Sequence, residues 1–516
     1  EIDRVVVDVE EIAHDRRDLA AARGLLPEVD DGVAAQRAQR VEAVAEDADI
    51  GDEEGVLVEQ QRDARLDRQL EPDARRRAHP LHERIADVQL ADLLALALDE
   101  HRAPRIEAAQ RGIRLNTDAI DNSAGVNTSD VEVNIKIALS APVRSGALTL
   151  EKRNTFLAEM TDEVARLVLR NNYQQTLALS LAQRRGLEDL GFQQRLMQTL
   201  EQRGELDRAV EFLPDDMTLG ERRKRNTGLT RPELAVLLAY AKLSLYGELL
   251  DSRVPDDPYL GRELNRYFPK EMSERYADAL HAHRLRREII ATQLTNSMIN
   301  RGGTTLIVRI ADQTGASSSS IAAAFAAVRN SYDLIELNGE IDALDNKVPG
   351  KVQLDLYAAV QNLLLDRLVW FLRNVDLSHG LEKIIGHYRD GIAQVENALD
   401  KALSKAAESA RDARIADLSK AGVPETLARR VANLPVLKSA PDIALVADRA
   451  GKPVGEVTAT YFATEAFFQL DSVASAVPNI VVSDYFDRLA LDRALDSIGD
   501  AERRLTAAMV ANGRAG

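Results

Sequence analysis

Apolar residues recur three and four positions apart through most of the chain after Leu150. Residues at this spacing share one face of an α-helix, so the pattern predicts helices that each bury an apolar stripe against a neighbour. The pattern is strongest in residues 234–245, 285–300 and 352–371. The third segment is the longest and most apolar, and we predict that it forms the central helix of a bundle. The turns between the predicted helices are short, which favours antiparallel neighbours.

Residues that start and stop helices fit these segments. Thr230 and Glu233 have the spacing of a capping box, and the helix that they open should end before Pro255. Thr161 precedes two acidic residues and is predicted to be another N-cap. Residues 302–303, both glycine, can supply a C-terminal cap. Two further helix entries are predicted at residues 315–320 and 422–425.

A polar segment precedes the helical region. Residues 116–132 gather Asn, Asp, Ser and Thr around Gly125 with little apolar surface, and residues 131–139 alternate apolar and polar positions. The polar part is predicted to be a loop or a helix entry. The alternating part is predicted to be a strand or a helix, because a pattern this short does not distinguish between the two. Polar loops often place hydroxyls, amides and backbone N–H groups against ligands. A functional loop and a structural turn cluster both remain open on composition alone.

The first 115 residues use a restricted set of amino acids. Ser, Thr, Asn, Lys, Met, Cys and all aromatic residues are absent before Asn116, and every residue type present except Ile can be encoded by a codon that begins with G or C. We interpret residues 1–104 as translated from a wrong reading frame or strand of a GC-rich gene. The alternative is a real low-complexity segment, either disordered or a solvated helical arm. No chemistry is assigned to it.

Composition excludes several classes of protein. The length of 516 residues fits two to four domains. The net charge of −17 disfavours sequence-independent binding to nucleic acid or to anionic lipid. The chain has no Cys, which excludes disulfides, Cys-ligated metals and thiol catalysis. No apolar run approaches the length of a membrane span, and the charged first residues do not resemble a signal peptide. We expect a cytoplasmic protein without membrane or nucleic-acid partners. Residue 1 is not Met, so we also expect the sequence to be a piece of a longer chain.

General catalytic motifs are missing. The sequence has no G-x-G-x-x-G, P-loop or G-x-S-x-G pattern. His281 and His283 would point to different helix faces, so we interpret them as structural residues. The basic run 222–225 is interpreted as a solvated loop or a partner for acids, and the acidic pairs 215–216 and 256–257 as helix caps. No metal site is assigned.

The polar segment resembles the end of the dinucleotide-binding domain in glutamate dehydrogenases. The residues that carry the resemblance are Asp118, Asn122, Gly125, Val126, Ser129 and Glu132. The flanking residues 116–118 and 133–136, and the stretches 230–235 and 285–294, are similar to the large NAD-specific enzymes of bacteria. The resemblance implies a mainly α fold from about residue 105. In it, residues 105–149 are the remnant end of a dinucleotide-binding α/β domain, and residues 150–516 are a helical C-terminal region.

The resemblance also implies a reaction and its ligands. L-Glutamate, NAD and water would give 2-oxoglutarate, ammonium and NADH, in a full-length enzyme that is a homo-oligomer. Asn122 would lie beside the nicotinamide–ribose end of NAD, and Gly125 would allow close approach or a positive φ. The hydroxyl of Ser129 would donate a hydrogen bond to the distal carboxylate of glutamate.

One departure from the family pattern limits this inference. The family's catalytic lysine and aspartate precede the dinucleotide-binding domain, whereas the first lysine here is Lys136, which follows Ser129. No catalytic residue is therefore assigned, and we predict an inactive C-terminal part of the enzyme. The alternative is a non-enzymatic helical module for oligomer contacts or regulation, in which the apolar stripes at 234–245 and 352–371 are partly interfaces.

Overall fold

The computed structural model describes residues 102–477, 480, 482 and 484–512, and the predicted low-complexity segment 1–104 lies almost wholly outside them. Every regular element within the described residues is a helix, which confirms the mainly α fold. The described part contains no strand, and the remnant of an α/β domain stays a prediction. No helix in the described part is long and apolar enough to cross a membrane.

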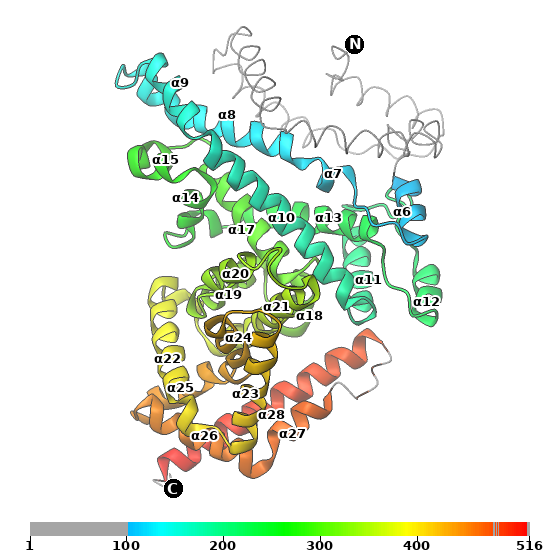
Figure 1. Ribbon diagram of the computed structural model, residues 1–516, viewed down its shortest axis with the longest axis vertical. Coiled ribbons are helices and arrows are strands. Elements are labelled where there is room, and N and C mark those ends of the chain that lie inside the picture. Colours follow the sequence, from blue (N-terminus) through cyan, green and yellow to red (C-terminus); the bar gives the residue numbers. More distant parts are fainter. Residues whose placement is uncertain (1–101, 478–479, 481, 483, 513–516) are drawn as a thin grey trace. The chain divides into compact units, whose positions relative to one another are not determined.

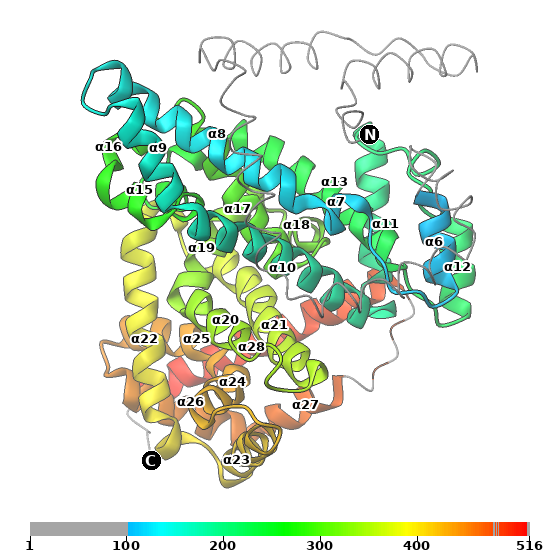
Figure 2. The same ribbon diagram turned by 45° about the horizontal axis from the view of Figure 1, so that its top comes forward.

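The helices follow one another with short connections (Figures 1 and 2). The first group is α6 (Arg102–Gln110), α7 (Asp118–Asp121), α8 (Ser123–Arg144), α9 (Leu150–Glu159), α10 (Thr161–Arg185), α11 (Leu187–Gln202), α12 (Asp216–Lys224) and α13 (Arg231–Leu250). The second is η2 (Val254–Asp256), η3 (Leu260–Arg262), α14 (Glu263–Tyr267), α15 (Lys270–Arg275), α16 (Ala277–His281), α17 (Arg286–Gly302), α18 (Leu306–Thr314), α19 (Ser318–Ser331) and α20 (Leu334–Asp342). The third is α21 (Gly350–Asn374), η4 (Leu377–His379), α22 (Leu381–Ala402), α23 (Lys405–Lys420), α24 (Glu425–Leu437), α25 (Ala440–Ala450), α26 (Val454–Phe468), α27 (Leu470–Ala476) and α28 (Tyr485–Ala511).

Helix α21 is the centre of the larger apolar core, as the sequence predicted. It contacts α18, α19, α20 and α24, and Figure 1 shows it among them. Its side chains Leu356, Leu368 and Phe371 are fully buried in that core. The five apolar residues predicted to form a stripe on α13 are also buried there: Leu234, Leu237, Leu238, Ala241 and Leu245. Both stripes therefore pack against other helices of the same chain.

A second, smaller apolar cluster joins α8 and α9 to α14, α15, α16 and the start of α17. Ile135 and Leu139 of α8 meet Phe268, Met272 and Leu280 in it. Helix α8 also contacts α10, which lies alongside it in both ribbon views. The smaller cluster thus fixes one face of α8 and leaves the opposite face uncovered.

Most of the predicted helix boundaries are confirmed. Glu233 accepts a hydrogen bond from the backbone N–H of Thr230 at 2.7 Å in the capping box that opens α13, and α13 ends before Pro255. Gly303, with φ of 95°, caps the C-terminus of α17. The entry predicted at 315–320 is the N-cap of α19, and the entry at 422–425 precedes α24.

The N-cap predicted at Thr161 is wrong by one residue. Met160 is the N-cap of α10, and Thr161 is the first helical residue. Only Met160 separates α9 from α10, so the backbone there stays in the helical region and does not become extended as a Thr cap requires. The Thr161 hydroxyl donates instead to the carbonyl of Ala158 at 3.0 Å.

Buried charges are paired between helices. Glu233 is fully buried and forms a two-pronged ion pair with Arg222 at 2.8 Å, so the first residue of the basic run is a partner for an acid. Near the C-terminus, Asp442 on α25 accepts hydrogen bonds from Nε1 of Trp370 at 2.8 Å and from Arg503 at 2.7 Å. These bonds tie α21, α25 and α28 together.

Candidate functional site

The predicted binding residues lie on a helical surface, not on a loop. Asn122 is the single residue between α7 and α8, and Gly125 and Ser129 belong to the first two turns of α8. Of the two predicted possibilities for the polar part, the structure has the helix entry and not the loop, and residues 131–139 are helix and not strand. The small polar residues there have weak helix propensity, but the buried side chains farther along α8, such as Val131 and Ile135, anchor the helix by tertiary packing.

The helical spacing brings the three residues to one face. Asn122, Gly125 and Ser129 are three or four positions apart, and all three are exposed. Val126 and Val133 continue the same face and are 76% and 47% exposed. The structure therefore gathers all the predicted binding residues on one open surface, which we call the α8 face.

The surroundings of Gly125 within the described chain do not explain why this position is a glycine. It lies in a helix and is not among the glycines with positive φ, so the positive φ that the sequence left open is excluded. A Cβ added at this position would meet no atom of the described chain within 4 Å. The absence of a side chain at Gly125 would therefore matter only to a ligand, or to a protein segment outside the described residues, that approaches the α8 face.

A polar network fixes α7 at the start of this face. Nδ2 of Asn116 donates to Oδ1 of Asp121 at 2.7 Å, and the Arg105 guanidinium pairs with Asp118. Arg231, at the start of α13, donates from Nε to Oδ1 of Asn116 at 2.9 Å. The position of Asn122 is therefore set by the first turn of α13 and not by α8 alone.

The buried side of α8 is held by Asn134 and His283. Nδ2 of Asn134 donates to the Tyr267 hydroxyl at 2.8 Å. Nδ1 of His283 accepts from the backbone N–H of Leu285 at 3.0 Å, so Nε2 carries the proton and donates to the Asn134 carbonyl at 3.0 Å. Burial lowers the pKa of His283 below its ordinary value, which favours this neutral form. The structural interpretation of His283 is confirmed.

The other candidate residues of the sequence have structural partners. Asp215 caps α12, as predicted. Asp257 is not the N-cap of η3, but its carboxylate accepts hydrogen bonds from the backbone N–H groups of Tyr259 and Leu260 at the start of that helix. Two further histidines, His379 and His387, are exposed and pair with Asp376 and with Asp448. No group of three or more His, Asp or Glu residues within the described part is arranged to hold a metal ion.

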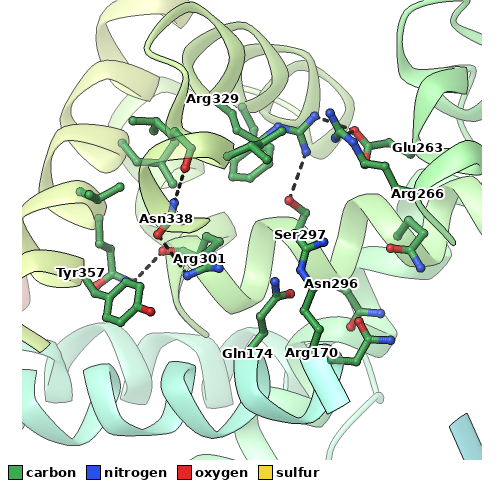
Figure 3. A pocket seen from close by; sticks show the side chains of 18 of the residues that line it. Arg170, Gln174, Glu263, Arg266, Asn296, Ser297, Arg301, Arg329, Asn338 and Tyr357 are labelled. Carbon is green, nitrogen blue, oxygen red and sulfur yellow. Dashed lines mark hydrogen bonds and ion pairs between the residues drawn. The ribbon is translucent and has the colours of Figure 1, made fainter. Parts of the chain in front are cut away.

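The sequence did not predict a cavity that several helices line together (Figure 3). Its most prominent side chains are four arginines, Arg170, Arg266, Arg301 and Arg329. They come from α10, from α14, from α17 and from α19. No local motif could have found them, because 159 positions separate the first from the last and only the tertiary fold brings them together.

Comparison with known proteins identifies the family. Residues 226–516 match the family described as "Glutamate dehydrogenase, C-terminal", and residues 96–182 match "Bacterial NAD-glutamate dehydrogenase, catalytic domain". The α8 face lies in the second of these matches.

Three curated relatives share the name NAD-specific glutamate dehydrogenase. Those of Halomonas elongata and Pseudomonas aeruginosa are 40% and 39% identical to this chain over 406 residues, which is 79% of this chain and 25% of each relative. That of Mycobacterium tuberculosis is 32% identical over 415 residues, which is 80% of this chain and 25% of the relative. The chain spans about a quarter of the length of the curated relatives that it matches. It belongs to the family of large bacterial NAD-specific glutamate dehydrogenases and corresponds to their C-terminal portion.

Proposed function

We propose that this chain is the C-terminal part of an NAD-dependent glutamate dehydrogenase. The complete enzyme would convert L-glutamate, NAD and water to 2-oxoglutarate, ammonium and NADH. In this proposal residues 105–149 are the end of the dinucleotide-binding domain, and residues 150–516 are the helical region that supports it. The observation that carries the proposal is the α8 face, on which Asn122, Gly125 and Ser129 are exposed together.

The residues of the α8 face suit the ligands. The Asn122 amide is neutral and can both donate and accept hydrogen bonds, so it can orient a nicotinamide without adding charge. The Ser129 hydroxyl can donate to the distal carboxylate of glutamate. The open space above Gly125 leaves room for a flat ring close to the helix backbone. NAD, when bound, supplies the acceptor for the hydride from Cα of glutamate, and the contribution of this chain is to position the two ligands.

Two features favour the enzyme part over the alternative of a non-enzymatic module. The stripes that the alternative would use as interfaces are buried inside this chain, against its own helices. By contrast, no described residue covers the α8 face, on which Asn122 and Ser129 are exposed together with Val126 and Val133. The homo-oligomer expected for the full-length enzyme stays a prediction that light scattering can test.

The purified 516-residue chain should form no NADH from glutamate and NAD, because the family's catalytic lysine would have to come from a region before Asn116, where the chain has none. The measurement is NADH absorbance with the full-length Pseudomonas aeruginosa relative as the positive control. Turnover by the chain at the level of that enzyme would contradict the proposal.

Substitution of Gly125 by Ala should separate stability from cofactor binding. In the isolated chain it should raise the free energy of unfolding by about 0.5–1 kcal/mol, because Ala is the better helix former and the site is open. In a full-length enzyme with this segment it should raise KM for NAD by about tenfold or more through steric overlap. The matched control is Gly499→Ala, which also adds an open Cβ within a helix and should stabilise without any change in KM. An unchanged KM for Gly125→Ala would argue against close approach at this glycine.

A further inference from the structure

The arginine-lined cavity has a volume of about 190 Å³, roughly the space of six water molecules in the liquid. It lies between the two apolar clusters. Val131 and Tyr267 of the smaller cluster border it on one side, and Phe325, Tyr357 and Leu364 of the larger cluster border it on the other. The lining therefore combines apolar side chains of both clusters with polar side chains that lie between them.

Positive charge exceeds negative charge in the lining. Glu263 is the only carboxylate among the lining residues, against four arginines, and it is shared by Arg266 and Arg329 at 2.6 Å each. Arg301 has an ion pair at 3.5 Å with Asp342, which is not a lining residue. This surplus of positive charge lies inside a chain whose net charge is −17.

Several hydrogen-bond donors of the lining have no partner within the described part of the chain. Arg329 is 5% exposed, and its Nε is buried without a hydrogen-bond partner. Arg170 has neither an ion pair nor a hydrogen bond to any described residue. The side-chain amides of Gln174, Gln293 and Asn296 are likewise unbonded to described residues. Figure 3 shows Arg170 and Gln174 extending from α10 toward Asn296 on α17. Among these donors the Nε of Arg329 is buried, whereas Arg170 is exposed and the three amides are partly exposed. A buried donor without a partner is costly, so the Nε of Arg329 marks a place where an acceptor belongs.

From this arrangement we propose that the cavity binds a small anion with two or more negative charges on carboxylate or phosphoryl groups. Guanidinium groups bind both kinds of group through paired hydrogen bonds. The amides of Gln174, Gln293 and Asn296 would donate to the remaining oxygens. The volume admits a short dicarboxylate or a phosphate with a few waters.

The electrostatics of Arg170 agree with this assignment. Burial lowers its pKa most, and the positive charge of Arg301 lowers it further. Asp342 opposes this effect, and Arg166 and Arg266 lower the pKa by smaller amounts. Like charges held this close repel one another, and an anion between them would turn the repulsion into attraction. The site does not depend on the function proposed for the α8 face.

The test measures binding of succinate and of inorganic phosphate to the 516-residue chain by calorimetry, with neutral succinamide as the ligand control. Arg170→Gln should weaken anion binding about tenfold or more, since it removes a charged donor that supports no other described residue. Arg166→Gln is the matched control. It removes the same charge one turn earlier on α10, from a residue that pairs with Glu163 and does not line the cavity. It should change affinity by no more than about twofold.

The outcomes are distinct. Saturable binding of succinate alone supports a carboxylate ligand, and saturable binding of phosphate alone supports a phosphoryl ligand. Binding should weaken at high salt and be absent with succinamide. No saturable heat with either anion would overturn the proposal. An equal loss in Arg170→Gln and Arg166→Gln would overturn it too, because it would show a general effect of surface charge. Thermal unfolding of both variants verifies that each remains folded.

Discussion

Replacement of Glu263 by Gln should lower the free energy of unfolding by about 3–5 kcal/mol. The Glu263 carboxylate is 4% exposed and is the common partner of Arg266 and Arg329. The Arg329 side chain is itself 6% exposed, so the substitution leaves a buried guanidinium without its counter-charge. Urea unfolding followed by circular dichroism at neutral pH measures the loss.

The ion pairs of Glu263 also make the free energy of unfolding depend on pH, in a direction that the shift in its pKa defines. Burial raises the pKa of Glu263, but Arg329 and Arg266 outweigh burial and hold the pKa below its ordinary value. The stabilisation is therefore fully present above the pKa of the unfolded chain and is lost as the pH falls through the lower folded pKa. The difference between the parent chain and Glu263→Gln should be constant near neutrality and shrink below about pH 4.

Glu271→Gln is the control for this prediction. Glu271 lies nearby on α15, is exposed, and loses the same charge when substituted. It should change the free energy of unfolding by no more than about 0.5 kcal/mol. A loss for Glu263→Gln as small as that of the control would mean that Arg329 is compensated in another way.

Replacement of Ser129 by Ala should lower kcat/KM for glutamate about 10- to 100-fold in a full-length enzyme that contains this segment. The loss corresponds to one hydrogen bond to a charged group, about 1.5–3 kcal/mol. Because Ser129 is exposed on α8, the substitution should leave thermal stability unchanged. Steady-state kinetics with glutamate varied at saturating NAD provides the measurement.

Ser145→Ala provides the comparison for Ser129→Ala. Ser145 is exposed at the C-terminal end of the same helix, away from the α8 face, and its hydroxyl donates to the carbonyl of Pro142. It should leave both kinetic constants unchanged. Equal kinetics for the two variants would remove Ser129 from the substrate site, whereas a loss of stability in Ser129→Ala would show that the residue supports the fold.

Much of the helical fold follows from local patterns. The stripe on α13 and the long apolar segment of α21 are buried as predicted, because a helix with one apolar face has few other ways to remove it from water. The capping box at Thr230 is correct because both of its groups lie within one turn of chain. Thr161 misled the prediction, since the course of the preceding helix α9 decides whether a Thr there can be extended.

The candidate site was only partly predictable. Residues 122–129 form one local motif, so their gathering on one surface follows once the segment is helical. The helical state itself depends on packing by distant residues such as Phe268 and Leu280, which the segment does not encode. The arginine cavity depends entirely on such distant contacts, and the charges that line it are isolated arginines in the sequence.

The separation of the two apolar clusters bears on how the molecule opens. The smaller cluster forms a separate set of apolar contacts and borders a cavity with several polar side chains, so we expect it to come apart at a lower free energy than the larger cluster. Backbone amides of α8 and α14 would then exchange with deuterium through a shared local opening of low free energy. Those of α21 would exchange only through complete unfolding. Helix α8, which carries Asn122 and Ser129, would thus belong to the part of the molecule that opens more readily. A ligand in the arginine-lined cavity would slow that opening.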